Sequence, residues 1–283
     1  MYGETNYDTG VSHTAVMYVV RSKMRIHEPK IYISVFTYIK YRVYMEHSSR
    51  MFGVVTKTWN PISGCTHDCV YCWARKLALN RLKRTRRYRD GFIPKLNVEE
   101  FRRKFKSGFI FVSDMGDAFN RDVKDEWIVR VLEHISRFPK ATFLLLTKNP
   151  ERYVDFIDIM PQNVMLGSTI ETDSDELYLK YKISKAPLPS RRLNAMQTLN
   201  WKYKFISIEP ILDFTGNFAK SIADIKPVMV YVGYDNYWNK LPEPSLNKTL
   251  KLIAELRGYG MDVREKGIRR AWYEKNINRS TSI

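Results

Sequence analysis

The 283-residue sequence predicts an α/β protein built from repeated strand–helix units. Six short apolar runs of strand length recur from Gly53 onward, helical patterns lie between them, and polar residues follow several of the runs. Near-continuous apolarity is typical of strands buried on both faces of a parallel sheet. The pattern fits an open doubly wound sheet as well as a full or partial βα barrel. In both folds, the loops at the carboxyl ends of the strands carry the chemistry.

The apolar runs set the expected order of the sheet strands. They are rich in branched and aromatic side chains, which favour extended backbone. We expect strands at residues 53–59, 108–113, 142–147, 163–170, 204–209 and 227–233.

The helices are predicted by spacing and by end signals. The stretch 122–138 places apolar residues at helical spacing, acidic residues in its first turn and Pro139 after its end. The stretch 150–160 begins with a proline, which suits the first helical position. The stretch 244–260 ends on glycines, which favour the backbone that closes a helix. A further helix is expected to begin near Trp73.

Three segments differ in character along the chain. Residues 1–50 contain "KIYISVFTYIKYRVYM", which predicts a small β-rich N-terminal extension. Because a second methionine stands at position 51, this segment is either an appended element or sequence upstream of the true start. Residues 51–265 carry the strand–helix repetition, and residues 266–283 are expected to form a basic C-terminal tail.

The charge of the chain indicates its partners only broadly. A formal net charge of +17 and a pI near 9.7 favour nucleic acid, another polyanion or an anionic membrane surface. A solvated, charge-rich surface is the alternative interpretation. No apolar run approaches the roughly 18 residues that a membrane span needs, and the start lacks a signal peptide. Because the three cysteines cannot all pair, we expect a cytoplasmic protein. Because no membrane span is predicted, we expect no membrane partner.

All three cysteines of the chain lie within one short stretch, "GCTHDCVYCWAR". Cys65, Cys69 and Cys72 have C-x3-C-x2-C spacing, which is typical of metal or cluster ligands. A structural zinc site normally needs four protein ligands, and His67 is poorly placed between two of the cysteines to be the fourth. A 4Fe-4S cluster can be held at three corners, with one iron open to another ligand. Zinc and unmetallated thiols remain alternatives.

The cysteine spacing, with Tyr71 just before the last cysteine, resembles the signature of the radical S-adenosylmethionine (radical SAM) superfamily. A closer resemblance covers about residues 54–265. The segments "TKTWNPISGCTHDCVYCWARKLA", "FIFVSDMGDAFNRDVKDEWI", "ATFLLLTKNPERY", "NVMLGSTIE" and "FISIEPIL" follow the motifs of a phage-type, three-Cys radical-SAM-like family of unknown function. Two features depart from that family. The cysteine loop is more compact, and "VGYDNYW" replaces its glycine-rich segment.

The resemblance implies a fold, cofactors and a reaction. The fold is a partial (βα)6 TIM-type barrel, and the cofactors are a 4Fe-4S cluster on the three cysteines and S-adenosylmethionine, with Tyr71 beside them. The reduced cluster would cleave S-adenosylmethionine to methionine and a 5′-deoxyadenosyl radical, so an electron donor is an implied partner.

Polar residues after the second strand are candidates for binding the cofactor. Ser113, Asp114 and Asp117 surround Gly116. The resemblance implies that this loop meets the amino group of S-adenosylmethionine, with Asp114 or Asp117 accepting from the ammonium. The alternative is that Asp117 or Asn120 caps a turn or the next helix.

Later strands end in further candidates. Lys148, after the third strand, would meet a carboxylate or phosphate, or is simply exposed before a helix. The resemblance assigns Ser168 and Glu171, after the fourth strand, to the adenosyl ribose hydroxyls. Glu209 follows the fifth strand, where a carboxylate is costly unless it is paired or lies in a cleft. It is either a cofactor-site residue or half of a structural ion pair.

A basic stretch follows the cysteines directly. Its apolar residues make one helical face, and beyond them basic side chains crowd the expected helix end, with Tyr88 available to stack on a base. A solvated basic helix end is the alternative. The nucleic-acid candidates are Arg81, Lys83, Arg84, Arg86 and Arg87.

These observations support one principal hypothesis and two alternatives. The first is a radical SAM enzyme that acts on nucleic acid or a nucleotide-derived substrate. The second is a non-catalytic nucleic-acid-binding protein whose cysteines hold zinc or a structural Fe-S site. The third is a radical SAM fold that has lost its activity.

Overall fold

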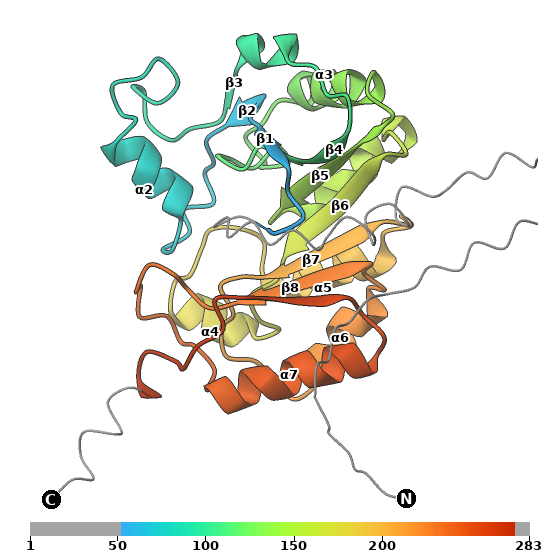
Figure 1. Ribbon diagram of the computed structural model, residues 1–283. Coiled ribbons are helices and arrows are strands. Elements are labelled where there is room, and N and C mark those ends of the chain that lie inside the picture. Colours follow the sequence, from blue (N-terminus) through green and yellow to red (C-terminus); the bar gives the residue numbers. More distant parts are fainter. Residues whose placement is uncertain (1–51, 275–283) are drawn as a thin grey trace, which may run out of the picture. The chain divides into compact units, whose positions relative to one another are not determined.

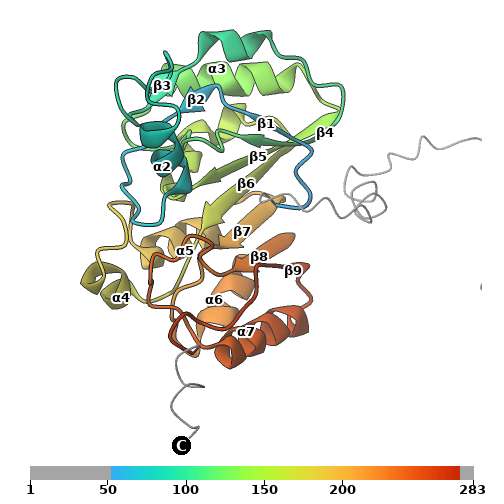
Figure 2. The same ribbon diagram turned by 60° about the vertical axis from the view of Figure 1, so that its left-hand side comes forward.

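One parallel sheet of seven strands organises the computed structural model, which describes residues 52–274 (Figure 1). The strands run in the order β1-β4-β5-β6-β7-β8-β9, and each neighbouring pair is parallel. Because spatial order follows chain order, each crossover returns on the same side, and the sheet curls into a half-barrel (Figure 2). The strands are β1 (Lys57–Trp59), β4 (Gly108–Val112), β5 (Ala141–Thr147), β6 (Val164–Thr169), β7 (Lys204–Ile208), β8 (Met229–Gly233) and β9 (Val263–Lys266).

Helices connect successive strands and cover the outside of the sheet (Figures 1 and 2). A small antiparallel pair, β2 and β3, lies beside the first strand. The remaining elements are β2 (Ile62–Ser63), α2 (Trp73–Asn80), β3 (Lys95–Leu96), the 3₁₀ helices η1 (Val98–Arg102) and η2 (Pro150–Ile159), α3 (Asp125–Ser136), α4 (Asp175–Lys180), α5 (Pro189–Thr198), α6 (Phe218–Asp224) and α7 (Leu246–Gly258).

Local sequence signals account for the helix ends. Helix α3 begins with Asp125 and Glu126, whose charges favour the amino end of a helix. Helix η2 has its proline in the first turn, as predicted. Helix α7 is capped by the Ser245 side chain, which accepts from Lys248 N, and it ends at Gly258.

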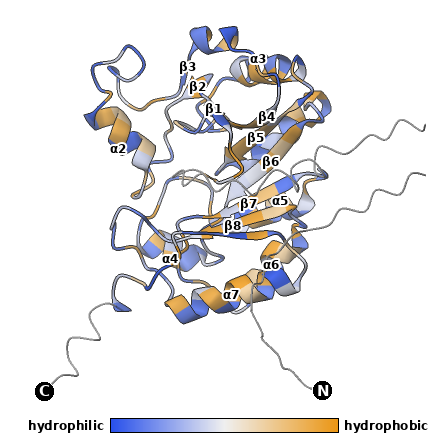
Figure 3. Cartoon of the chain, viewed as in Figure 1, coloured by the Kyte–Doolittle hydropathy of each residue, from blue (hydrophilic) through white to orange (hydrophobic). Residues whose placement is uncertain are grey.

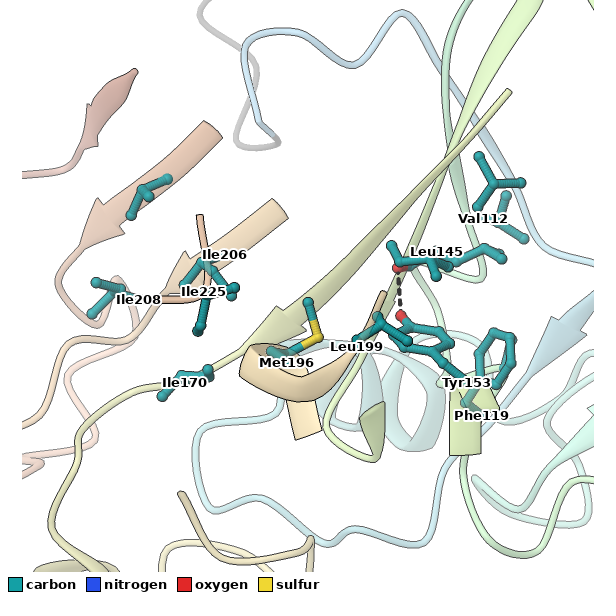
Figure 4. Close-up of a cluster of buried hydrophobic side chains, with 14 of the residues drawn as sticks. Val112, Phe119, Leu145, Tyr153, Ile170, Met196, Leu199, Ile206, Ile208 and Ile225 are labelled. Carbon is teal, nitrogen blue, oxygen red and sulfur yellow. Dashed lines mark hydrogen bonds between the residues drawn. The ribbon is translucent and has the colours of Figure 1, made fainter. Parts of the chain in front are cut away.

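Alternate side chains of each strand point to opposite faces of the sheet. Ile206 and Ile208 belong to the core that the sheet shares with its helices, together with Leu145 and Met196 (Figure 4). In the same core, the Tyr153 hydroxyl lies 2.7 Å from Leu145 O and 2.8 Å from Gly167 O. The hydrophobic colour on β5 and β8 in Figure 3 reflects burial on both sides.

The concave face has its own aromatic packing at the amino end of the strands. Phe52 contacts Phe111, Phe205 and Tyr231, with ring centroids 5.7, 5.0 and 4.7 Å away. These rings pack against one another on the concave face. The polar candidates lie just beyond the carboxyl ends of the strands.

The six expected strands and the α/β half-barrel are confirmed, and three details differ. Strand β9 was not predicted, because "VREK" lacks an apolar run. Helix α2 ends at Asn80, so the basic residues beyond it lie in turns and not on a helix end. The expectation that Tyr88 can stack on a base is wrong, since the residue is 4% exposed and packs against Phe92.

The ends of the chain bear on the predicted segments. The β-rich extension over residues 1–50 lies outside the described residues. Of the predicted tail, residues up to Glu274 pack on the barrel, where Ala271 is buried and Trp272 Nε1 donates to Leu241 O at 2.7 Å. Residues 275–283 also lie outside the described part. Within residues 52–274, no helix is long and apolar enough to cross a membrane.

Candidate functional site: the cysteine loop at the carboxyl edge of the half-barrel

The three cysteines lie in the loop between β2 and α2, and all are free thiols. Gly64 opens this loop and pairs with Gly116, so the loop lies along the segment that follows β4. Gly64 has a φ of +84°, and a Cβ there would lie 2.0 Å from Ile93 O. Only glycine fits this approach without moving the backbone.

Each thiol has a different neighbour. Cys65 Sγ lies 3.4 Å from His67 N and 3.5 Å from Asn120 Nδ2. Cys69 Sγ lies 3.1 Å from Ser184 Oγ, and the Ser184 hydroxyl in turn donates to His67 O. Cys72 Sγ caps helix α2 by accepting from Arg75 N at 3.3 Å. The loop is thus held at several points, as a preorganised ligand set requires.

The thiols are electrostatically coupled. Burial raises the pKa of Cys65 well above its usual value, and negative charge on Asp117, Cys69 and Cys72 raises it further. Burial likewise raises the pKa of Cys72 to about 11. Within residues 52–274, no three His, Cys, Asp or Glu side chains are arranged to hold a single metal ion. A cluster held at three corners instead needs three separate thiolates on one loop, and its binding would displace the thiol protons.

A buried carboxylate, Asp117, organises the side of the site next to β4. It accepts from His67 Nε2 at 3.0 Å, Thr147 Oγ1 at 2.7 Å and the backbone N of Lys148 at 3.0 Å. Burial opposes its ionisation, but these donors, His67 first, outweigh burial and lower the pKa of Asp117. His67 therefore has one ring nitrogen engaged by Asp117.

A second buried carboxylate, Glu171, organises the side next to β6. It accepts from Lys148 Nζ and Arg192 Nη1, both at 2.6 Å, and from the Tyr71 hydroxyl. Glu171 and Arg192 have no exposed surface. Burial raises the pKa of Glu171, but the charges of Arg192 and Lys148 outweigh burial and lower it to about 2. Glu171 is therefore an anchor for the tyrosine of the cysteine loop that is ionised at neutral pH.

The end of β4 holds two polar candidates. Ser113 is buried with a φ of +58°, and its hydroxyl has no hydrogen-bond partner among the described residues. Asp114 accepts from Asn60 Nδ2 at 2.6 Å, and burial raises the pKa of its carboxyl. An unpartnered buried hydroxyl on left-handed backbone is costly, so this turn is suited to receive a ligand.

The structure separates the two remaining candidates from this group. Ser168 has the same strand parity as Leu166 and Ile170, which belong to the core shared with the helices. Among residues 52–274, its hydroxyl has one hydrogen-bond partner, Thr169 O, at 3.5 Å. Glu209 follows β7 and pairs with Lys266 of β9 at 3.3 Å, while burial raises the pKa of Glu209.

The basic candidates differ in exposure. Arg81, Lys83, Arg84 and Arg86 are exposed. Arg87 is half-buried and pairs with Glu99 and Glu100 at 3.1 and 2.9 Å. The acids that balance Arg87 come from beyond β3, so the basic stretch alone did not reveal them.

Sequence reasoning missed Arg192 and Ser184 as neighbours of the cysteine loop. Arg192 lies in the polar helix sequence "PSRRLNAMQT", where nothing distinguishes it from the exposed Arg191. Ser184 lies in an irregular segment before α5. No local signal marks either residue, because Ser184 meets Cys69 across 115 residues of chain and Arg192 meets Glu171 across 21.

Solved structures share this architecture. Spore photoproduct lyase, in a complex with dinucleoside spore photoproduct, aligns with a TM-score of 0.51 and 12% identity, covering 72% of this chain and 75% of that one. A variant of the same lyase with bound AdoMet and dinucleoside spore photoproduct aligns with a TM-score of 0.50 and 12% identity, covering 73% and 75%. At this identity, the likeness shows the fold: a partial TIM-type barrel of the kind that radical SAM enzymes have.

The family of the chain follows from a sequence match. Residues 52–230 match the family described as "Protein of unknown function (DUF5131)", and the chain belongs to that family. No curated protein matches the chain.

Proposed function

We propose that the protein is a radical SAM enzyme. In this proposal Cys65, Cys69 and Cys72 hold a 4Fe-4S cluster, and S-adenosylmethionine binds beside it. The observation that carries the proposal is the placement of three coupled free thiols on one loop at the carboxyl edge of a parallel half-barrel. When bound and reduced by an electron donor, the cluster would supply the electron that cleaves S-adenosylmethionine to methionine and a 5′-deoxyadenosyl radical.

The residues of the chain would bind and orient this cofactor. The unpartnered hydroxyl of Ser113 and the carboxyl of Asp114 are proposed to meet the ammonium of S-adenosylmethionine. Tyr71, held by Glu171, would close the other side of the cysteine loop. Glu209 is proposed to line the concave face beyond them. We do not extend the proposal to Asp117 or Ser168, because Asp117 already accepts from several donors and Ser168 lies on the helix-facing side.

Anaerobic reconstitution with iron and sulfide tests the proposal. We expect a brown protein with about four irons per chain and an electron paramagnetic resonance (EPR) signal on reduction. Reduction in the presence of S-adenosylmethionine should release 5′-deoxyadenosine. Cys65→Ser, Cys69→Ser and Cys72→Ser should each lose the chromophore, whereas Ser221→Ala, at a half-buried position of helix α6, should keep it. A colourless wild-type protein with one zinc would contradict the proposal, and a cluster without cleavage would indicate a fold that has lost activity.

The substrate is proposed to be nucleic acid or nucleotide-derived. The support is the net charge of +17 and the exposed Arg81, Lys83, Arg84 and Arg86 beyond helix α2. A likeness of fold to a lyase whose structure holds a dinucleoside photoproduct agrees with this substrate class. The predicted affiliation with a phage-type family stays a prediction.

The proposed substrate class can be tested by comparing variants of exposed arginines with a variant of an arginine that is already ion-paired. Arg84→Ala with Arg86→Ala should weaken binding to an oligonucleotide and reduce the slope of log affinity against log salt by about 1.4 to 1.8, for two lost phosphate contacts. Arg87→Ala should leave that slope unchanged, since Glu99 and Glu100 already neutralise Arg87. Fluorescence anisotropy at several salt concentrations measures both. Equal slopes in all proteins would remove the reason for naming this substrate class.

A further inference from the structure

A buried group of charged side chains beside the cysteine loop contains more positive than negative charge. Lys148 and Arg192 both contact Glu171 at 2.6 Å, so two cations share one carboxylate. The side chains of Glu171 and Arg192 are fully buried, and that of Lys148 is 12% exposed. The group, Lys148–Glu171–Arg192, therefore has an excess of one positive charge.

The guanidinium of Arg192 has no further acceptor for two of its nitrogens. Its Nη1 donates to Glu171 and to Thr169 O, but Nε and Nη2 have no hydrogen-bond partner among the described residues. The guanidinium carbon lies 5.0 Å from the ring centroid of Tyr178. Uncompensated buried charge costs several kcal/mol, so this group needs a nearby anion.

The cysteine loop is where that anion would lie. Tyr71, between Cys69 and Cys72 in the chain, donates to Glu171, and Lys148 Nζ lies 5.2 Å from the Tyr71 ring centroid. Cys69, two residues before Tyr71 in the same loop, is buried. The nearby Asp117 does not supply the balance, because His67 and the backbone of Lys148 already engage its carboxylate.

We propose that Arg192 is a positioning residue that, together with Lys148, supplies the counter-charge for the thiolate-bound cluster and so raises its reduction potential. This inference rests on the proposed function. Reduction adds one electron and makes the occupant of the loop more negative by one charge. No proton is transferred, because Glu171 stays ionised in both states. A fixed cation nearby stabilises the reduced form more than the oxidised form.

The test is a potentiometric titration of the reconstituted protein, with dithionite as reductant and EPR as readout, without S-adenosylmethionine. Arg192→Gln should lower the equilibrium constant for reduction of the cluster at least tenfold, which is a fall of about 59 mV in reduction potential for one electron. Arg192→Lys should restore most of the shift, because it keeps the charge. Lys148→Gln should also lower the potential. It replaces Arg192→Gln as the test if Arg192→Gln does not fold.

A matched control separates charge from helix packing. Lys204 is a buried cation that also contacts α5, through Met196 O at 3.1 Å and Leu199 O at 3.2 Å. It lies at the amino end of β7, at the edge opposite the cysteine loop. Lys204→Gln should leave the potential unchanged. Equal potentials in wild type, Arg192→Gln and Lys148→Gln would overturn the inference while leaving the cluster in place. Absence of a cluster in wild type would instead overturn the proposed function.

Discussion

The two buried carboxylates at the carboxyl edge, Asp117 and Glu171, are stabilised in different ways. Asp117 accepts from a histidine, a threonine hydroxyl and two backbone amides, so most of its donors are neutral dipoles, and only His67 also acts through its charge. Glu171 accepts from two cations and a tyrosine. Burial opposes the ionisation of both, and in both the donors prevail and lower the pKa.

The difference indicates two tasks. Dipolar donors hold a charge in place without adding another, which suits the fixing of loop geometry near Cys65. Paired cations overcompensate a charge, which leaves one excess positive charge beside Tyr71 of the cysteine loop. One carboxylate therefore anchors the loop, whereas the other holds the charges that favour an anionic occupant.

The largest expected effect comes from removing the charge of Glu171. Glu171→Gln leaves two buried cations without a carboxylate, so we expect a loss of about 3–5 kcal/mol in the free energy of unfolding. Urea denaturation of the cluster-free protein measures it. Adding Arg192→Gln removes one of the orphaned cations and should recover part of the loss. An unchanged urea midpoint in Glu171→Gln would show that the charge of Glu171 does not stabilise the two cations, and so would contradict the difference drawn between Glu171 and Asp117.

A smaller effect is expected from Asp117. Asp117→Asn keeps the size of the side chain but replaces a charged acceptor, which should cost about 1–3 kcal/mol in the free energy of unfolding. Thr147→Val, which removes one neutral donor to Asp117, should cost about 1 kcal/mol. Both are measured by the same urea titration. A loss for Asp117→Asn as large as that for Glu171→Gln would contradict the division into dipolar and ionic anchors.

A pH-dependent difference between wild type and Glu171→Gln is expected in acid. A carboxyl group whose folded pKa is lowered contributes stability above its usual pKa, and this is lost as pH falls through the folded value. For Glu171 that window runs from 4.5 down to about 2. Wild type should lose at most about 1.4 kcal/mol per pH unit through this group. Urea midpoints across the window should fall less steeply for Glu171→Gln than for wild type. Parallel slopes would place the acid sensitivity elsewhere.

The strand–helix order and the cysteine loop were predictable because their signals are local. Buried strands need continuous apolar runs, and helices need periodic ones, so Phe143 to Leu145 or Val131 to Ile135 show their state within a few residues. Strand β9 carries Arg264 and Lys266, and only its pairing with β8 makes it a strand. Tyr71 and Glu171 were candidates from the sequence, but their contact with each other was not predicted.

The sequence by itself determined the strand–helix repetition, the three thiols on one loop and the polar residues at the strand ends, because each depends on neighbours in the chain. The tertiary structure alone decided how charges are paired. Arg191 and Arg192 are adjacent and chemically identical, yet Arg191 pairs with Glu151 at the surface and Arg192 meets Glu171 in the interior. Burial sets the strength of an ionic contact, and burial depends on which segments of the chain fold over it.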